Sequence, residues 1–176
     1  LHRDHDITLY EAGDRIGGHS HTHTVRQAGR DYRVDTGFIV YNEWTYPQFS
    51  ALLATLGVAT QPTTMSFSVR NDVKGLEYNG TTLNTLFAQR RNFVRPSFLA
   101  MVCDILRFNR EAPRLLRAGS GEQPLGELLR AGGYSRHFVD DYIIPMGAAI
   151  WSTNPRSMFS FPARFFVRFL MNHGML

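Results

Sequence analysis

The chain has 176 residues, of which 43% are hydrophobic and 19% are charged, and it contains 15 Gly and 8 Pro. This length and apolar content exclude a disordered or collagen-like chain and suit one packed domain, or one domain with a piece of another. The net charge of +4 comes from 18 dispersed Arg residues and one lysine, Lys74, a pattern that argues against a nucleic-acid-binding surface.

The opening segment predicts a strand that enters a glycine-rich loop. Residues 6–10 are rich in β-formers, and residues 11–18 carry Glu11, Arg15 and three glycines. In a dinucleotide-binding unit, an acidic residue after the second strand accepts hydrogen bonds from the ribose, about 20 residues beyond a G-x-G-x-x-G turn. Glu11 has ten residues before it, and neither that turn nor a phosphate-binding P-loop occurs in the chain. We therefore expect a partial chain.

Two segments carry a family resemblance. Residues 9–22, Leu-Tyr-Glu-Ala-Gly-Asp-Arg-Ile-Gly-Gly-His-Ser-His-Thr, resemble the segment that follows the first βα unit in the flavin amine oxidase and phytoene desaturase superfamily. Residues 31–38 resemble that family's next strand, whose Asp-x-Gly turn comes close to the flavin ring. With the downstream pattern, the chain is similar to bacterial amine-oxidase-like FAD/NAD(P)-binding flavoproteins, which implies FAD as the cofactor.

The resemblance implies five cofactor-binding residues: Glu11, Arg15, Gly17, Gly18 and Gly37. An arginine fork suits a pyrophosphate or the adenosine edge, and glycines let the backbone approach phosphate or a flat ring closely. The alternative is a strand–turn–strand connection in which the glycines only supply positive φ angles. No catalytic base is identified.

A histidine run follows the loop. His19, His21 and His23 alternate with Ser and Thr, so a strand would place three imidazoles on one face. Same-face neighbours stand about 7 Å apart, too far for three to share one ion easily. We expect no metal site there, and favour polar residues that line the flavin site or face solvent over a metal cluster.

The middle of the chain predicts a helix and a small antiparallel sheet. Residues 46–56 have helical apolar spacing, with Gly57 at the position of a C-cap. Residues 63–70 alternate like a half-buried strand, and Asn79-Gly80 predicts a type I′ hairpin between residues 76–78 and 81–83. The superfamily's substrate domain contributes such a patch.

The remaining sequence predicts helices. Residues 96–116 carry an apolar face that is expected to bury Cys103, residues 119–121 break it, and residues 124–129 start another helix. The Arg and Glu side chains of residues 107–117 and the adjacent pair Asp140-Asp141 are expected to face solvent. Residues 124–129 and 142–151 resemble helical cap segments of the family, and the resemblance places residues 145–151 toward the substrate cavity.

The phenylalanine-rich stretch 159–170 allows two interpretations. Its aromatic residues at helical spacing favour a core helix, whereas the interleaved Arg164 and Arg168 would also suit an amphipathic membrane-surface helix or the lining of a lipid-sized pocket. The single cysteine excludes an internal disulfide and fits the cytoplasm, and no transmembrane segment is expected.

The expected fold class is α/β plus α+β. Residues 1–42 would be the remnant of a Rossmann-like FAD-binding domain, and residues 43–176 a partial substrate domain with mixed hairpin and helical structure. The function implied is that of a fragment of an FAD-dependent oxidoreductase that transfers a hydride from a small organic molecule, of apolar or lipid-like character, to flavin. Its further partner would be the remainder of its own domain, and membrane contact is not favoured. The alternative is a non-enzymatic module associated with lipid or a membrane surface.

Overall fold

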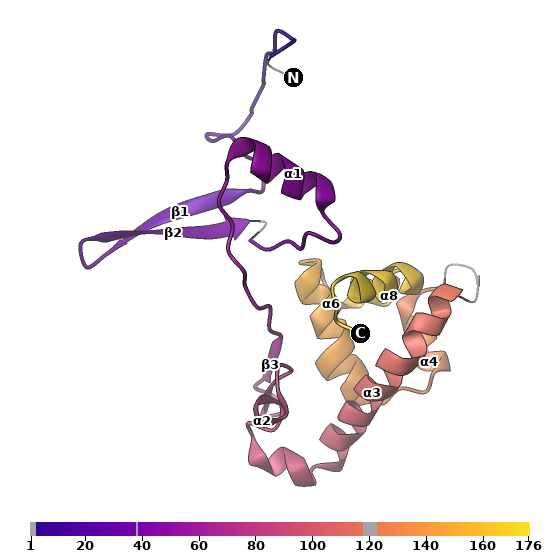
Figure 1. Cartoon of the computed structure of the whole chain (residues 1–176). Helices are drawn as coiled ribbons and strands as arrows, with labels where there is room; N and C mark the ends of the chain where they lie inside the picture. Colours follow the sequence, from indigo (N-terminus) through magenta and orange to yellow (C-terminus); the bar gives the residue numbers. More distant parts are fainter. Residues whose placement is uncertain (1–2, 38, 118–122) are drawn as a thin grey trace. The chain divides into compact units, whose positions relative to one another are not determined.

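The computed structural model describes residues 3–37, 39–117 and 123–176 (Figure 1). Its contacts divide the chain into two compact units, unit 1 (Leu1–Ala59) and unit 2 (Thr60–Leu176). Each unit is described by itself below.

Unit 1 contains an antiparallel hairpin. Strand β1 (His21–Gln27) pairs with β2 (Arg30–Gly37), with Gln27 opposite Arg30 across a two-residue turn. Ala28 and Gly29 in this turn have φ angles of 50° and 75°. Positive φ at both central positions is the conformation of a type I′ turn, whose twist matches that of the paired strands. The strand expected in residues 31–38 is therefore confirmed over its described part, while residue 38 lies outside the described residues.

Residues 6–10 form no strand, which corrects the prediction for the opening segment. These residues have β-forming side chains, but no described strand pairs with them. A strand needs hydrogen-bonding partners on a neighbouring strand, and composition alone does not supply them.

The predicted first helix is present as α1 (Pro47–Leu56). It begins with a proline, which lacks the amide hydrogen that a first-turn residue would leave unpaired. It ends at Gly57, whose φ of 66° places it in the left-handed region that closes a helix. The proline and the glycine thus set the two ends of α1.

The described residues of unit 1 form no buried core. None of the described residues among 3–59 is buried, and Tyr10 and Trp44 are 91% and 84% exposed. A polypeptide of this size gains its stability mainly by removing apolar surface from water. The described part of unit 1 therefore depends on its hairpin and helix hydrogen bonds rather than on a packed interior.

Unit 2 opens with a second small sheet. Strand β3 (Ser68–Asn71) pairs antiparallel with β4 (Leu76–Asn79), so the predicted antiparallel patch is present. The hairpin turn lies at residues 72–75 rather than at Asn79-Gly80, which corrects the predicted position of the turn. Gly75 has a φ of 57°, and its amide donates to the carbonyl oxygen of Asp72.

Asn79 and Gly80 have a different role from the predicted one. The Asn79 side chain accepts from the amide of Thr81 at 2.8 Å, and the amide of Gly80 donates to Phe67 at 2.9 Å. Asn79 therefore ends β4 and leads into α2, whose capping box is formed by Thr82 and Thr85.

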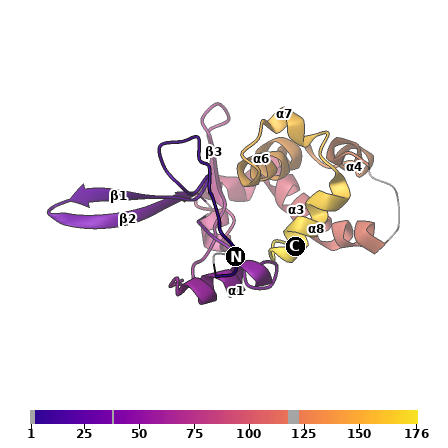
Figure 2. The ribbon, with the colours of Figure 1, turned by 90° about the horizontal axis from the view of Figure 1, so that it is seen from above.

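The other elements in the described part of unit 2 are helices (Figure 2). They are α2 (Leu83–Leu86), the 3₁₀ helix η1 (Arg90–Val94), α3 (Pro96–Arg117), α4 (Leu125–Ala131), α5 (Arg136–Phe138), the π-helix η2 (Val139–Ile143), α6 (Ile144–Ile150), α7 (Pro155–Met158) and α8 (Ala163–Asn172). Helix α3 packs against α5 and α8, and α4 also contacts α8. The predicted helices of residues 96–116 and 124–129 are confirmed, while the predicted break at 119–121 lies outside the described residues.

The core of unit 2 is built around α3 and α8. Its fully buried side chains come from most elements of the unit and include Tyr78, Phe98, Met101, Phe108, Leu125, Phe138, Ile143, Met158, Phe166, Val167 and Leu170. The aromatic stripe of residues 159–170 therefore contributes to a core helix. Cys103, by contrast, is exposed on α3, which corrects its expected burial.

The observed fold is a mixed α/β structure with two small antiparallel sheets and a set of helices. The Rossmann-like remnant and the boundary between residues 42 and 43 stay predictions. In the described part of the chain, no helix combines the length and the apolar character that crossing a bilayer requires.

Candidate functional site

The loop of residues 11–20 is organised by its own polar side chains. Glu11 accepts a hydrogen bond from the amide of Gly13 at 2.8 Å through Oε1. Arg15 donates from its two terminal nitrogens to the carbonyl oxygens of Gly18 and Ser20, at 2.7 and 2.9 Å. The arginine fork thus closes the loop on itself instead of extending freely into solvent.

Gly17 and Gly18 both adopt conformations that favour glycine. Their φ angles are 125° and 57°, and a Cβ on Gly17 would lie 3.0 Å from the carbonyl oxygen of Ser20. A Cβ on Gly18 would have no atom within 4 Å. Gly17 is therefore needed for the turn itself, whereas Gly18 is also open to an approaching group.

Gly37 lies next to the same loop. A Cβ added to it would overlap the carbonyl oxygen of His19, so no larger residue fits there without moving the backbone. His21, at the start of β1, pairs with Gly37 at the end of β2. The structure thus brings the end of β2 to the loop that carries Gly17 and Gly18, and the requirement for glycine at position 37 comes from this chain's own backbone.

The histidine run does not form a straight row of separate imidazoles. The rings of His21 and His23 approach to 3.8 Å between centroids, and the register of the hairpin shifts between His21 and Thr22. Partial desolvation, the Arg15 guanidinium and His23 lower the pKa of His21, while Asp14 raises it. The described residues include no group of three or more His, Cys, Asp or Glu side chains placed to hold a metal ion.

A second polar site, which sequence reasoning missed, lies in unit 2 around Asp141. This carboxylate is 1% exposed and accepts from Lys74 Nζ at 2.8 Å through both oxygens. His137 Nδ1 lies 2.9 Å from Oδ2, and Asn71 Nδ2 lies 3.3 Å from Oδ1. The prediction that both members of the Asp140-Asp141 pair face solvent is therefore wrong for Asp141 and correct for Asp140, which is exposed.

The backbone of Asp141 is also engaged. Its carbonyl oxygen accepts from the hydroxyl of Tyr78 at 2.6 Å, so β4 reaches the same residue as the β3–β4 turn. Burial, with smaller effects from Tyr142 and Asp141, raises the pKa of Tyr78 well above its usual value. Asp141 lies inside η2, and short π-helical segments often occur at functional positions. The one sequence feature that could have pointed to this buried ion pair was Lys74, the chain's single lysine.

Arg107 is also less exposed than predicted. It forms an ion pair with Asp104 at 2.9 Å, donates to the carbonyl oxygen of Gly132 at 2.8 Å and lies 4.0 Å from the centroid of the Tyr134 ring. Nearby, an apolar hollow of about 320 Å³ opens between α3 and α4, lined mainly by Phe108, Ala112, Leu115, Leu128 and Tyr134. The run 145–151, which the resemblance placed toward a substrate cavity, buries Met146 and Gly147 in the core.

Comparison with known proteins identifies the class. The loop, the glycine turn and the mixed fold lie within a match to the family model of flavin-containing amine oxidoreductases, which covers residues 1–166. The chain belongs to the flavin-containing amine oxidoreductase family, which confirms the recognition based on residues 9–22 and 31–38. Searches of curated proteins and of solved structures found no match.

The family is flavin-containing, consistent with FAD as the cofactor, and the residues of unit 1 fit part of that molecule. Glu11 is exposed and engages one oxygen within its loop, while a carboxylate offers two oxygens and can accept further hydrogen bonds from ribose hydroxyls. The space beside Gly18 admits a group that a side chain would exclude. These features suit the adenosine end of FAD.

Proposed function

We propose that this chain contributes part of the FAD site and the substrate domain of an oxidoreductase that oxidises a C–N or C–C single bond of a small organic molecule, with the hydride leaving one of the bonded carbons for flavin. The observation that carries the proposal is the match of residues 1–166 to the flavin-containing amine oxidoreductase family. The flavin supplies the electron-accepting chemistry when it is bound. The chain's own residues hold and orient it.

Within this proposal, Glu11 accepts hydrogen bonds from the ribose of FAD. Arg15 acts mainly by holding the carbonyl groups of Gly18 and Ser20, since both its terminal nitrogens donate there. Gly17 forms the turn, and Gly18 leaves room for the cofactor. Gly37 keeps the end of β2 against His19, which fixes the loop relative to the hairpin.

The phosphate-binding part of the site is proposed to come from polypeptide outside these 176 residues. A G-x-G-x-x-G turn cradles the pyrophosphate with backbone amides at a helix N-terminus, and this sequence contains none. We therefore expect the chain alone to bind FAD weakly and to turn over no substrate.

We propose that the two predicted domains bind different molecules. Residues 1–42 serve the cofactor and residues 43–176 serve the substrate, which we expect to be a small molecule of apolar or lipid-like character. The single cysteine keeps the cytoplasm as the expected compartment.

The proposal is tested by isothermal titration of FAD into the chain and, in parallel, into a longer chain that carries a G-x-G-x-x-G unit ahead of residue 1. Binding by the longer chain, with weak or no binding by the shorter one, is the expected result. The longer chain is then mixed anaerobically with a panel of amines and unsaturated hydrocarbons, and loss of the yellow flavin absorbance reports hydride transfer. Failure of both chains to bind FAD would overturn the assignment.

A further inference from the structure

Helix α8 presents two different faces. Ala163, Phe166, Val167 and Leu170 are buried in the core of unit 2. The opposite side, here named the α8 outer face, consists of the exposed residues Phe165, Arg168, Met171 and Asn172. Phe165 is 54% exposed and Met171 is 43% exposed, so this face carries large apolar side chains in contact with water.

The exposed aromatic ring on this face is held in place by its neighbours. The ring centroid of Phe165 lies 5.7 Å from that of Phe161 and 6.3 Å from that of Trp151. Both neighbours are half-buried, and Trp151 also contacts Phe169 at 4.7 Å. A ring that its neighbours already hold in place loses less conformational entropy on binding than a freely rotating side chain does.

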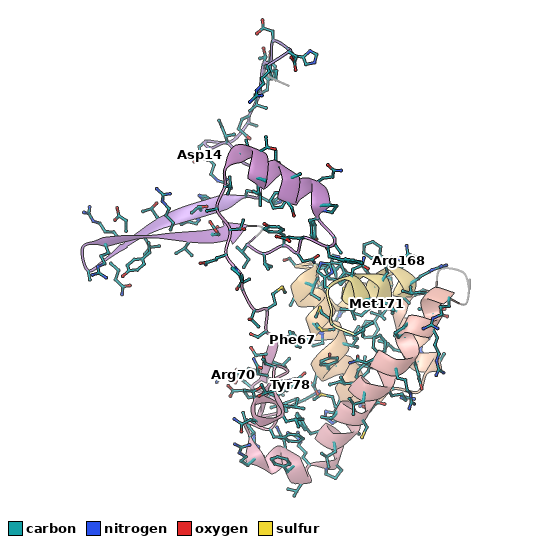
Figure 3. The ribbon with its side chains drawn as sticks, in the orientation of Figure 1. Asp14, Phe67, Arg70, Tyr78, Arg168 and Met171 are labelled. Atoms are coloured by element: carbon teal, nitrogen blue, oxygen red, sulfur yellow. The ribbon has the colours of Figure 1, made fainter. Side chains whose placement is uncertain are left out.

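The charged residues of the sequence segment that contains α8 are all basic. Residues 142–176 contain Arg156, Arg164 and Arg168 but no Asp or Glu. Arg164 donates to the carbonyl oxygen of Leu116, whereas Arg168 is exposed and pairs with no carboxylate in the described part of the chain. Figure 3 labels Arg168 and Met171 on this helix. A cation next to apolar side chains, with no nearby acidic residue in the sequence, complements a negatively charged surface.

We propose that the α8 outer face docks on the surface of an anionic lipid bilayer. Phe165 and Met171 would enter the boundary between headgroups and acyl chains, and the guanidinium of Arg168 would bind lipid phosphate. The apolar side chains of Phe165 and Met171 beside the guanidinium of Arg168 suit this interface, where acyl chains meet hydrated, charged headgroups. This surface belongs to unit 2, whereas the proposed FAD loop belongs to unit 1.

The test is co-sedimentation of the full chain with vesicles of phosphatidylcholine alone and of phosphatidylcholine mixed with phosphatidylglycerol. The expected result is binding to the mixed vesicles only. Phe165→Ser and Arg168→Glu should each weaken that binding about tenfold, and Met171→Ser should weaken it in the same direction. Circular dichroism verifies that each variant keeps its helices.

Matched substitutions elsewhere provide the controls. Leu106→Ser on α3, Arg130→Glu on α4 and Trp44→Ser in unit 1 change exposed residues of similar character and should leave binding unchanged. No binding to the mixed vesicles, equal binding to both kinds of vesicle, or an equal loss in the control variants would overturn the proposal.

Discussion

Lys74 Nζ lies 2.8 Å from both carboxylate oxygens of Asp141, a residue 67 positions further along the chain. The lysine side chain is 33% exposed, whereas that of Asp141 is 1% exposed. A charge taken out of water at this depth is tolerated because it is paired and hydrogen-bonded. The pair therefore joins the β3–β4 turn to η2 and fixes the small sheet on the helices of unit 2.

Asp141→Asn should destabilise unit 2 by about 2 kcal/mol, because Lys74 and His137 lose the carboxylate between them. Asp140→Asn is the matched control: Asp140 is adjacent but exposed, so its substitution should change the free energy of unfolding by less than about 0.5 kcal/mol. Urea unfolding followed by circular dichroism measures both. Equal effects of the two substitutions would contradict the role of the buried pair.

The hydroxyl of Tyr78 predicts a pH dependence at alkaline pH. Because burial raises its pKa in the folded state, its contribution to stability is fully present below its unfolded pKa of about 10.0 and is lost progressively as the pH rises above that value. Tyr78→Phe removes this dependence together with the hydrogen bond to Asp141. The stability difference between wild type and Tyr78→Phe should therefore narrow as the pH rises from about 10 to about 12. A constant difference in urea midpoints over this range would show that Tyr78 does not titrate as expected.

Gly147 tests the packing of α6 in the core. A Cβ at this position would lie 2.6 Å from Met158 Cε and 3.0 Å from Phe166 Cε2. We expect Gly147→Ala to lower the free energy of unfolding by about 1–2 kcal/mol, since the flexible end of Met158 can move but the ring of Phe166 is buried. Ala149→Ser, at an exposed position of the same helix, is the control. An unchanged urea midpoint in Gly147→Ala would show that the core accommodates the extra methyl group without cost.

Unit 1 and unit 2 should differ in amide hydrogen exchange. The described residues of unit 1 include none that is buried, and an isolated two-stranded hairpin is marginally stable in water. The amides of β1 and β2 should thus exchange rapidly, while those of α3 and α8 exchange slowly through global opening. Mass spectrometry of peptide fragments measures this contrast, and equal protection in the two units would contradict it.

The sequence predicted elements that local signals determine. Helix α1 has a proline at its first position and a glycine at its C-cap, so both of its ends can be read from local residues. Helix α3 has a continuous apolar stripe, and the aromatic spacing of residues 159–170 correctly favoured a core helix.

Features that depend on distant partners were not predictable in the same way. Residues 6–10 have β-forming side chains, but strand formation needs a partner strand that composition does not reveal. The hairpin turn was predicted at Asn79-Gly80, but it lies at residues 72–75, where Lys74 forms an ion pair with Asp141. The burial of Asp141 is set by contacts across 67 positions, so no local pattern separates it from the exposed Asp140.

The candidate site was predictable to the extent that it lies within one short motif. Glu11, Arg15, Gly17 and Gly18 were identified from the family resemblance, and the family itself is confirmed. The bonds from Arg15 to the carbonyl groups of Gly18 and Ser20 depend on the three-dimensional path of the loop, which residue types alone do not specify. The contact of the predicted site residues with the cofactor stays a prediction for all five: Glu11, Arg15, Gly17, Gly18 and Gly37.

The most direct measurement is the affinity for FAD of the longer chain, which carries the G-x-G-x-x-G unit, by isothermal titration with Glu11→Gln and Asp14→Asn in parallel. Loss of the carboxylate at position 11 should weaken binding about tenfold, because a hydrogen bond to a charged acceptor contributes about 1.5–3 kcal/mol. Asp14→Asn, an exposed acid in the same loop, should bind as wild type does. Equal affinity of wild type and Glu11→Gln, or an equal loss in both variants, would contradict the assignment of this loop to the cofactor.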